Sequence, residues 1–308
     1  MMFEQMQTAS EQRPGAGTKG PRMDCANPLT RKLSHFAQLS QSDRDVLDVL
    51  ACHEEQFPAD VDIVTEGMAP RSVFVVKDGM AIRYRLLPDG GRQIITFLLP
   101  GDLCDNHTFL LRAMDHSIAT LTPVRIAPIS RESMMQTFAR HPRISAALWW
   151  SSMQEEAMLR ERIVSLGRRD ARGRIAYLLC ELLWRHAAIG MTEGKRFRFP
   201  LTQTELGDTL GITPVHVNRI LKEYRARGLI AMDRKMLDLL DVKGLQDIAA
   251  FDQSYLQLRG ATDNVAQYFD ALERGELASV DPQPALPRPG AGLTNGQRAR
   301  QFASGEAV

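Results

Sequence analysis

Residues 201–222 constrain the fold of this 308-residue chain more than any other stretch. Thr202 is followed three residues later by Glu205, which is the pattern of a capping box and predicts that a helix begins at Gln203. Gly211 supplies the left-handed conformation that commonly ends such a helix. The segment therefore predicts a short helix with a defined start and a defined end.

A second helix is expected directly after this turn. Thr213 can cap it, and Pro214 suits its first position, where the backbone needs no amide hydrogen. Both helices carry apolar residues spaced for one buried face: Leu206, Leu210, Val217, Ile220, Leu221 and Tyr224. Two short helices joined by a tight turn form a helix-turn-helix. The apolar runs 229–232 and 236–240, joined by 233–235, predict a β-hairpin after it, which makes a winged helix.

The exposed face of the second helix carries candidates for contact with DNA. Arg219 is the best candidate for reading a base, because its guanidinium can bond O6 and N7 of guanine together. Pro214 and Val215 can offer apolar contact to a thymine methyl group. The other predicted DNA-binding residues suit phosphates, which fix register without encoding sequence, or cap the helix: His216, Thr202, Gln203, Lys222 and Thr213.

The charge distribution agrees with a nucleic-acid partner once it is resolved along the chain. The whole chain has 38 Lys and Arg against 37 Asp and Glu, a formal net charge of +1. Residues 167–240 hold 14 of the basic residues and 8 of the acidic ones, which leaves +6 on this segment and −5 on the rest. We therefore expect DNA binding to be orientation-selective and steeply dependent on salt.

Composition excludes several other classes of protein. With 44% hydrophobic and 24% charged residues, the chain has the composition of a soluble globular protein. Its apolar runs are too short to cross a bilayer, and it shows no secretory signal, so a cytoplasmic protein without membrane contact is expected. The cysteines form no C-x-x-C pair, which argues for reduced thiols rather than a disulfide framework or a cysteine-ligated metal: Cys25, Cys52, Cys104 and Cys180.

The sequence pattern of residues 61–129, before the helical half, predicts β-structure. Short apolar or alternating runs, separated by glycine-containing turns, predict strands of a barrel, sandwich or roll: 61–65, 72–77, 81–87, 93–98, 117–120 and 124–129. A helix around 42–51 precedes them. The ends of the chain, rich in Gly and Pro, are expected to be flexible.

A long helix is predicted from Pro142 to Gly167, since no Gly or Pro interrupts that stretch. Apolar residues recur along it at spacings of four and three, which is consistent with a helix–helix contact. The predicted dimer-interface residues on this line are Trp150, Met153, Ala157 and Val164. Trp149 and Ile163 belong to a second apolar line, so the register stays open. The alternative is a helix lying on its own β-domain.

These segments together resemble the Crp/Fnr family of bacterial transcription regulators, relatives of the cyclic-AMP receptor protein. The resemblance covers residues 28–243 and is strongest in 170–176 and 201–228, with Gly79 and 100–102 fitting the sensor domain. It implies an α+β fold of a cyclic-nucleotide-binding-like β-roll (a double-stranded β-helix), a long dimerisation helix and a C-terminal winged helix-turn-helix. It also implies a homodimer on a palindromic operator and RNA polymerase as a partner.

The resemblance sets the expected domain limits. They are a flexible tail at 1–26, the β-roll sensor domain at 27–139, the dimerisation helix at 140–166, the winged helix-turn-helix at 167–243, C-terminal helices at 244–276 and a second flexible tail at 277–308.

Two departures from the family pattern bear on the effector. Where cyclic-nucleotide binders carry Gly-Glu and Arg-Ser pairs, this chain has Asp105-Asn106 and His116-Ser117. Losing the arginine removes the bidentate partner of an anionic phosphate, so a cyclic nucleotide is disfavoured at this predicted effector pocket. Cys25 alone cannot hold the iron–sulfur cluster of the oxygen-sensing branch. The effector itself stays unknown.

Two alternative functions remain at this stage. A redox-, haem- or metal-responsive DNA-binding switch could use Cys104, His107 and His116, which lie close in sequence. A cupin-like metalloenzyme is remote, because the chain has no His-x-His pair and no catalytic motif. The chain is therefore not expected to be an enzyme.

Overall fold

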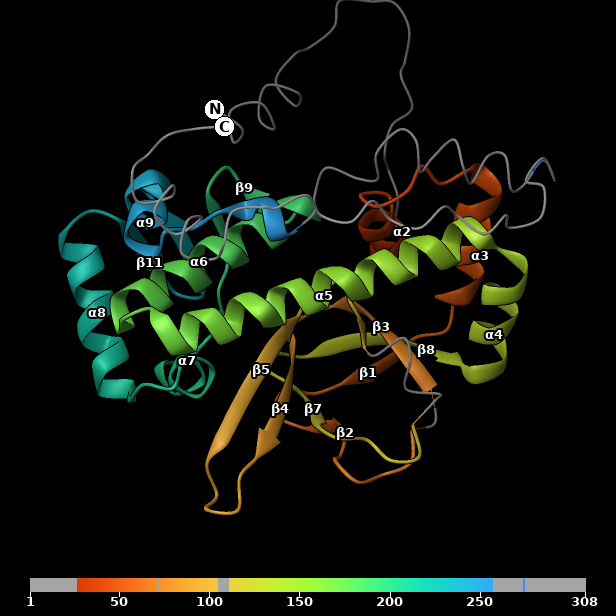
Figure 1. Ribbon diagram of the computed structural model, residues 1–308, viewed down its shortest axis with the longest axis horizontal. Helices are drawn as coiled ribbons and strands as arrows, with labels where there is room; N and C mark the ends of the chain where they lie inside the picture. Colours follow the sequence, from red (N-terminus) through yellow and green to blue (C-terminus); the bar gives the residue numbers. More distant parts are fainter. Residues whose placement is uncertain (1–26, 71, 105–110, 257–273, 275–308) are drawn as a thin grey trace, which may run out of the picture. The chain divides into compact units, whose positions relative to one another are not determined.

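The N-terminal half of the protein is built from two four-stranded antiparallel sheets. The computed structural model describes residues 27–70, 72–104, 111–256 and 274 (Figure 1). One sheet has the order β1-β8-β3-β6 and the other β2-β7-β4-β5. The strands are β1 (Glu55–Phe57), β2 (Asp62–Val64), β3 (Ser72–Asp78), β4 (Ala81–Leu86), β5 (Arg92–Leu98), β6 (Leu103–Cys104), β7 (Ser117–Thr120) and β8 (Val124–Ser130). All six predicted strands are present, and β1 and β6 are additional.

The two sheets share a core, which identifies this half as the expected β-roll. Phe74 and Ile126 from the first sheet pack with Leu98 and Ile118 from the second. Gly79 makes the β3–β4 turn with a φ of +86°, and a Cβ at this position would collide with the carbonyl oxygen of Pro123. Only glycine allows this turn to lie so close to the neighbouring loop.

Four helices surround the β-roll. They are α2 (Pro28–Leu33), α3 (Gln41–Leu50), α4 (Arg131–Arg140) and α5 (Pro142–Arg168). A second apolar cluster joins Leu29 and Leu47 of the first two helices to Val75 of β3 and to Leu148 of α5. The 27-residue α5 extends from α4 to the C-terminal half of the protein (Figure 1).

The C-terminal half is a winged helix. Its elements are α6 (Ala171–Ala188), β9 (Thr192–Glu193), β10 (Arg196–Arg198), α7 (Gln203–Leu210), α8 (Pro214–Ala226), β11 (Ile230–Asp233), β12 (Met236–Leu239), α9 (Val242–Ala249) and η2 (Gln253–Leu256). The predicted hairpin β11–β12 is present, but it belongs to a four-stranded sheet of order β11-β12-β10-β9. No sequence pattern predicted β9 and β10.

The winged helix and the β-roll share one apolar core. Ile94 and Phe97 of β5 belong to the same buried cluster as Leu179 and Leu183 of α6 and Ile220 of α8. The two halves are therefore packed together rather than joined by a linker alone.

Arg174 fixes the junction of α5, α6 and α7. Its guanidinium donates to the carbonyl oxygens of Leu166 at 2.7 Å, Leu210 at 3.0 Å and Arg169 at 3.0 Å. Asp170 caps α6 by accepting from the Gly173 amide at 2.7 Å. Because Leu166 lies near the end of α5 and Leu210 ends α7, one side chain satisfies carbonyls at the ends of two helices. This arginine therefore has a structural role at the junction.

The segment after α9 covers α6. Phe251 and Tyr255 pack on Tyr177 with ring centroids 4.9 and 5.9 Å away, and Leu256 packs with Met158 and Trp184. The expected C-terminal helices thus begin at Val242, and their continuation beyond residue 256 lies outside the described residues, as do both predicted tails. No helix in the described ranges is long and apolar enough to cross a membrane.

Candidate nucleic-acid interface

The predicted caps of the helix-turn-helix are present. Thr202 Oγ1 accepts from the Glu205 amide at 3.2 Å, and Glu205 Oε2 accepts from the Thr202 amide at 2.6 Å, which completes the capping box of α7. Gly211 ends the helix with a φ of +64°. Thr213 Oγ1 then accepts from the His216 amide at 3.3 Å and caps α8. The start and end of α7 and the start of α8 therefore carry the local caps that the sequence predicts.

The predicted DNA-binding residues are accessible. Val215 is 81% exposed. The other exposed candidates lie at the starts of α7 and α8 and along the outer side of α8: Thr202, Gln203, Thr213, Pro214, Arg219 and Lys222. His216 is half-buried. The opposite side of α8 is buried through Val217, Ile220, Leu221 and Tyr224, as the spacing predicts.

Arg219 and His216 are in contact on α8. Nη2 of Arg219 lies 2.9 Å from Nε2 of His216. Since a guanidinium can only donate, the imidazole nitrogen must be the acceptor in this contact. His216 thus orients Arg219 in addition to its predicted role at a phosphate.

A carboxylate on α8 is neutralised locally. Glu223 lies 2.9 Å from Nη2 of Arg172 and 3.6 Å from Nη1 of Arg227. The hydrogen bond from Arg172 lowers the pKa of the Glu223 carboxyl below its usual value. At the tip of the wing, Arg234 and Lys235 are exposed. The surface around α8 therefore keeps its basic character, which suits a polyanion.

The β-roll contains a cavity of about 330 Å³ between its sheets. Most of its wall is apolar, including Phe57, Met68, Phe74, Met114, Ile118 and Ile126, and Cys104 also lines it. Among the described lining residues, Glu55, Thr65 and Ser72 are the polar ones, and none is basic. These residues offer no cation for a phosphate group.

The predicted effector residues lie elsewhere or outside the described part. His116 is buried with Nδ1 2.7 Å from Asp115 Oδ1, and Ser117 accepts from the Glu66 amide at 2.9 Å. The neighbouring Met114 and Ile118 line the cavity instead. Asp105, Asn106 and His107 lie outside the described residues. Within the described ranges no group of three His, Cys, Asp or Glu side chains is arranged to hold a metal ion.

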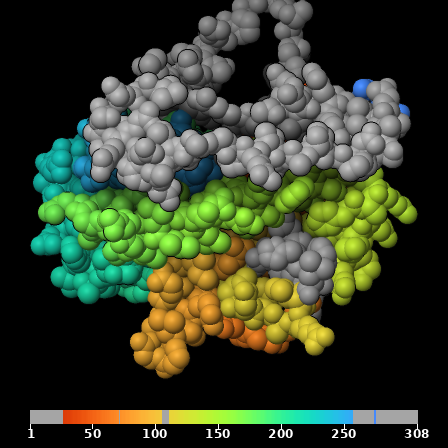
Figure 2. Space-filling model, in the orientation of Figure 1, coloured from red at the N-terminus to blue at the C-terminus, as the bar shows by residue number. Residues whose placement is uncertain are grey.

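The predicted dimer-interface residues separate into two sets. Met153 and Val164 are 50% and 45% exposed on α5. Ala157 is buried within the protomer, and Trp150 is half-buried against the cluster of α2, α3 and α4. Residues of the second apolar line, Trp149 and Ile163, are more than 70% exposed. α5 forms a continuous band on the surface in Figure 2.

A β-roll followed by a long helix and a winged helix defines a class of DNA-binding transcription regulator. Residues 54–141 match the cyclic nucleotide-binding domain, and residues 173–248 match the Crp-like helix-turn-helix domain. The chain thus carries a cyclic nucleotide-binding domain followed by a Crp-like helix-turn-helix domain, and it is a DNA-binding transcription regulator of the Crp/Fnr type.

Known proteins similar to this chain agree with that assignment. The transcriptional activator protein FnrL of Cereibacter sphaeroides is 29% identical over 147 residues, which cover 47% of this chain and 58% of FnrL. The nitrogen fixation regulation protein FixK of Rhizobium meliloti is 28% identical over 163 residues, covering 51% and 68%. The chain thus spans between about half and two thirds of these relatives. The solved structure of FixK2 from Bradyrhizobium japonicum has the same fold, with a TM-score of 0.59, 23% identity and coverage of 65% of this chain and 98% of that one.

Proposed function

We propose that this regulator binds a palindromic DNA operator as a homodimer in the cytoplasm and acts on RNA polymerase there. The observation that carries the proposal is the exposed start of α8, where Arg219, Pro214 and Val215 face solvent while Val217 and Ile220 anchor the helix in the core. A recognition helix meets base edges with the residues of its N-terminal part. Arg219 is the base-reading residue in this proposal.

An exposed apolar strip on α5, which takes Met153 and Val164 from the predicted interface and the rest from the second apolar line, supports the homodimer. Trp149, Met153, Ile163 and Val164 are large, apolar and at least 45% exposed on one helix. A second copy of the same strip is a suitable cover, because a two-fold interface pairs one surface patch with itself. A two-fold dimer also matches a palindromic site, in which the half-sites lie about one helical turn apart.

The cavity in the β-roll supports an effector other than a cyclic nucleotide. Its described lining combines apolar side chains with the polar residues Glu55, Thr65 and Ser72 and includes no basic side chain, which suits a small uncharged molecule better than an anion. An anionic phosphate in this wall would lose its hydration without gaining a charged partner.

One observation favours a second candidate function, a redox-responsive switch. Cys104, a buried free cysteine, is among the residues that line the cavity, which makes it the thiol nearest to a small oxidant bound there. The haem or metal form of this hypothesis needs His107, which lies outside the described residues. Metal analysis and an absorption spectrum of freshly purified protein test it, and apoprotein that binds its operator unchanged after oxidation would contradict it.

Selection of binding sites from a random DNA library tests the DNA-binding proposal. The wild-type protein should select an inverted repeat. Arg219→Ala should lose preference at one base pair per half-site, a change of about 1–3 kcal/mol. Arg225→Ala, which removes another exposed arginine of α8, serves as the control and should keep the preference. Selection of the same sites by Arg219→Ala would refute the assignment of Arg219.

Light scattering tests the dimer. Trp149→Glu combined with Met153→Glu places charges on the exposed strip of α5 and should give monomers that bind the operator weakly. Val49→Glu changes an equally exposed apolar residue on α3 and should leave the dimer intact. A stable dimer of the double variant would refute an interface at this strip.

A further inference from the structure

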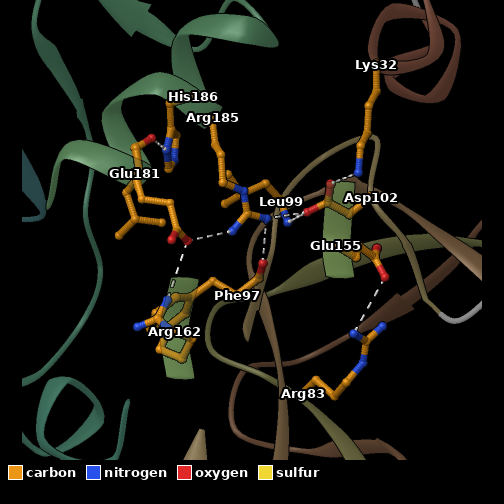
Figure 3. A network of polar contacts seen from close by, with 11 residues as sticks. Lys32, Arg83, Phe97, Leu99, Asp102, Glu155, Arg162, Glu181, Arg185 and His186 are labelled. Carbon is orange, nitrogen blue, oxygen red and sulfur yellow. Dashed lines mark hydrogen bonds and ion pairs between the residues drawn. The ribbon is translucent and has the colours of Figure 1, made fainter. Parts of the chain in front are cut away.

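A single buried carboxylate joins the β-roll to the winged helix (Figure 3). Asp102 lies in the turn between β5 and β6. Its Oδ1 accepts from Nζ of Lys32 on α2 at 2.6 Å, and its Oδ2 accepts from Nη2 of Arg185 on α6 at 2.8 Å. All three side chains are less than 10% exposed. Lys32 belongs to the same half of the protein as Asp102, whereas Arg185 belongs to the winged helix.

Arg185 connects this carboxylate to further elements. Its Nη2 also donates to the carbonyl oxygen of Phe97 on β5 at 2.7 Å, and its Nη1 lies 3.6 Å from Oε1 of Glu181. Glu181 in turn lies 3.5 Å from Nη2 of Arg162 on α5 and accepts from the hydroxyl of Tyr255 at 3.3 Å. The network therefore joins the β-roll, α5 and α6 (Figure 3), and Tyr255 adds η2 to it.

The charged groups of this network keep one another ionised. Burial by itself would raise the pKa of the Asp102 carboxyl, but Lys32, Arg185 and the hydrogen bond from the Leu99 amide more than offset it and lower the pKa below its usual value. Burial likewise opposes the charge of Arg185, and the neighbouring Asp102 and Glu181 raise its pKa. Both groups are thus ionised in the folded protein.

The network restricts the orientation in which the two halves can pack. The apolar core that they share is held by burial, which does not depend on direction and tolerates small rotations of α6. A buried guanidinium that bonds a carboxylate and a carbonyl at once accepts only one arrangement. Other polar contacts also join the halves. Arg31 Nη1 donates to the carbonyl oxygen of Ile189 at 2.7 Å, His35 Nε2 lies 2.6 Å from the carbonyl oxygen of Ala188, and Gln93 Nε2 donates to the carbonyl oxygen of Thr209 at 3.3 Å. The ion pair of Arg92 with Asp208 at 2.8 Å is 32% and 23% exposed and therefore weaker. In the pair of Asp102 with Arg185, by contrast, both partners are charged and less than 10% exposed.

We propose that Asp102 and Arg185 are positioning residues for DNA recognition: their buried ion pair holds the winged helix at one angle on the β-roll and so sets the separation of the two recognition helices in the dimer. This rests on the proposed binding of a palindrome by a dimer. The position of each α8 relative to the two-fold axis determines which half-site spacing fits. A small rotation of α6 at Arg185 would move both recognition helices.

The position of Asp102 also connects this pair to the cavity. Asp102 precedes the two residues of β6, Leu103 and Cys104, and Cys104 pairs with Phe74 of β3. Both Cys104 and Phe74 line the cavity. A change in the filling of the cavity would therefore move β6, which directly follows Asp102, and the ion pair would transmit this movement to α6.

Two variants that are matched in chemistry separate positioning from stability. Arg185→Met removes the buried ion pair between the halves and leaves their other contacts in place, and Lys32→Met removes a contact to the same carboxylate within the β-roll. Neither variant leaves a carboxylate alone, because Asp102 keeps its other cation and Glu181 keeps Arg162 and Tyr255. Both variants should fold, as circular dichroism checks.

The assay is the affinity for operators whose half-sites are moved apart or together by one base pair. The wild-type protein and Lys32→Met should prefer the selected spacing, and Arg185→Met should lose most of that preference, a change on the order of tenfold. Base preference within each half-site should stay the same. An Arg185→Met protein that keeps the spacing preference, or a Lys32→Met protein that loses it equally, would overturn the proposal. A wild-type protein without any spacing preference would instead contradict dimeric binding itself.

A double-mutant cycle tests the connection to the cavity. Cys104→Phe places a larger side chain into the cavity and should change the spacing preference in the wild-type background. The same substitution should have no further effect in Arg185→Met, because the contact that transmits it is gone. Equal effects in the two backgrounds would show that the cavity acts on the winged helix by another route and would overturn this connection.

Discussion

Acid should destabilise the protein through His186, a histidine that is buried in its neutral form. The side chain lies on α6 with Nδ1 2.8 Å from the carbonyl oxygen of Leu182 and its ring centroid 4.8 Å from that of Phe197. Burial lowers its pKa from 6.5 to about 4, and the nearby Arg185 acts in the same direction. The unfolded chain therefore binds a proton between pH 6.5 and pH 4 that the folded protein does not bind.

The sign and size of the effect follow from this difference. Where the unfolded state binds more protons, the free energy of unfolding falls as the pH falls. Each pKa unit corresponds to about 1.4 kcal/mol, so His186 should remove about 3 kcal/mol of stability between pH 7.5 and pH 4. Below pH 4 both states are protonated at this residue, and it contributes no further loss.

Urea unfolding at a series of pH values measures this contribution. His186→Phe retains a ring beside Phe197 but cannot titrate, so the difference in unfolding free energy between wild type and variant should shrink by about 3 kcal/mol from pH 7.5 to pH 4. Comparison with the variant cancels the titration of Asp102 and other carboxylates. His53→Gln removes an exposed histidine and serves as the control. A difference that stays constant over this pH range would refute the assignment of acid sensitivity to His186.

Two further predictions concern α7 and α8. A Cβ at Gly207 would lie 2.6 Å from the carbonyl oxygen of Ile212, so Gly207→Ala should lower the melting temperature. Gly167 lies in open space on α5, so Gly167→Ala should raise the melting temperature, because alanine stabilises a helix by about 0.5–1 kcal/mol relative to glycine. Equal shifts in a thermal melt would contradict this reading of the turn. Lys222→Ala should weaken binding to all DNA sequences alike and reduce the slope of log affinity against log salt by about 1. A change in base preference would instead assign Lys222 to a base edge.

The helix-turn-helix could be predicted almost residue by residue because its signals are local. The capping box at Thr202, the left-handed Gly211 and the cap at Thr213 each act over three or four residues, and the structure contains all three. The strands β9 and β10 could not be predicted in the same way. They have only two and three residues, and β10 is held by pairing with β12, about forty residues later.

The face of α5 and the buried network depend on contacts distant in sequence. Trp149 and Trp150 are adjacent and equally apolar, and only the packing of α2, α3 and α4 decides that Trp150 is the more buried of the two. Arg185 lies at the end of an apolar helix and Asp102 in a glycine turn, 83 residues apart. The one sequence signal for this ion pair is a charged residue among the apolar residues of a helix, and this signal does not indicate which residue pairs with it.

The shared core has a consequence for how the protein unfolds. Ile94 and Phe97 of the β-roll are buried by α6, so a winged helix cut out at residue 170 would expose Leu179 and Leu183 to water. Because of these contacts, each half buries its apolar surface only when the other half is folded. Thermal unfolding of the two halves should therefore be one cooperative transition. The DNA-binding half would then have no independent stability to be measured, and a fragment made from it would aggregate rather than report on its affinity for DNA.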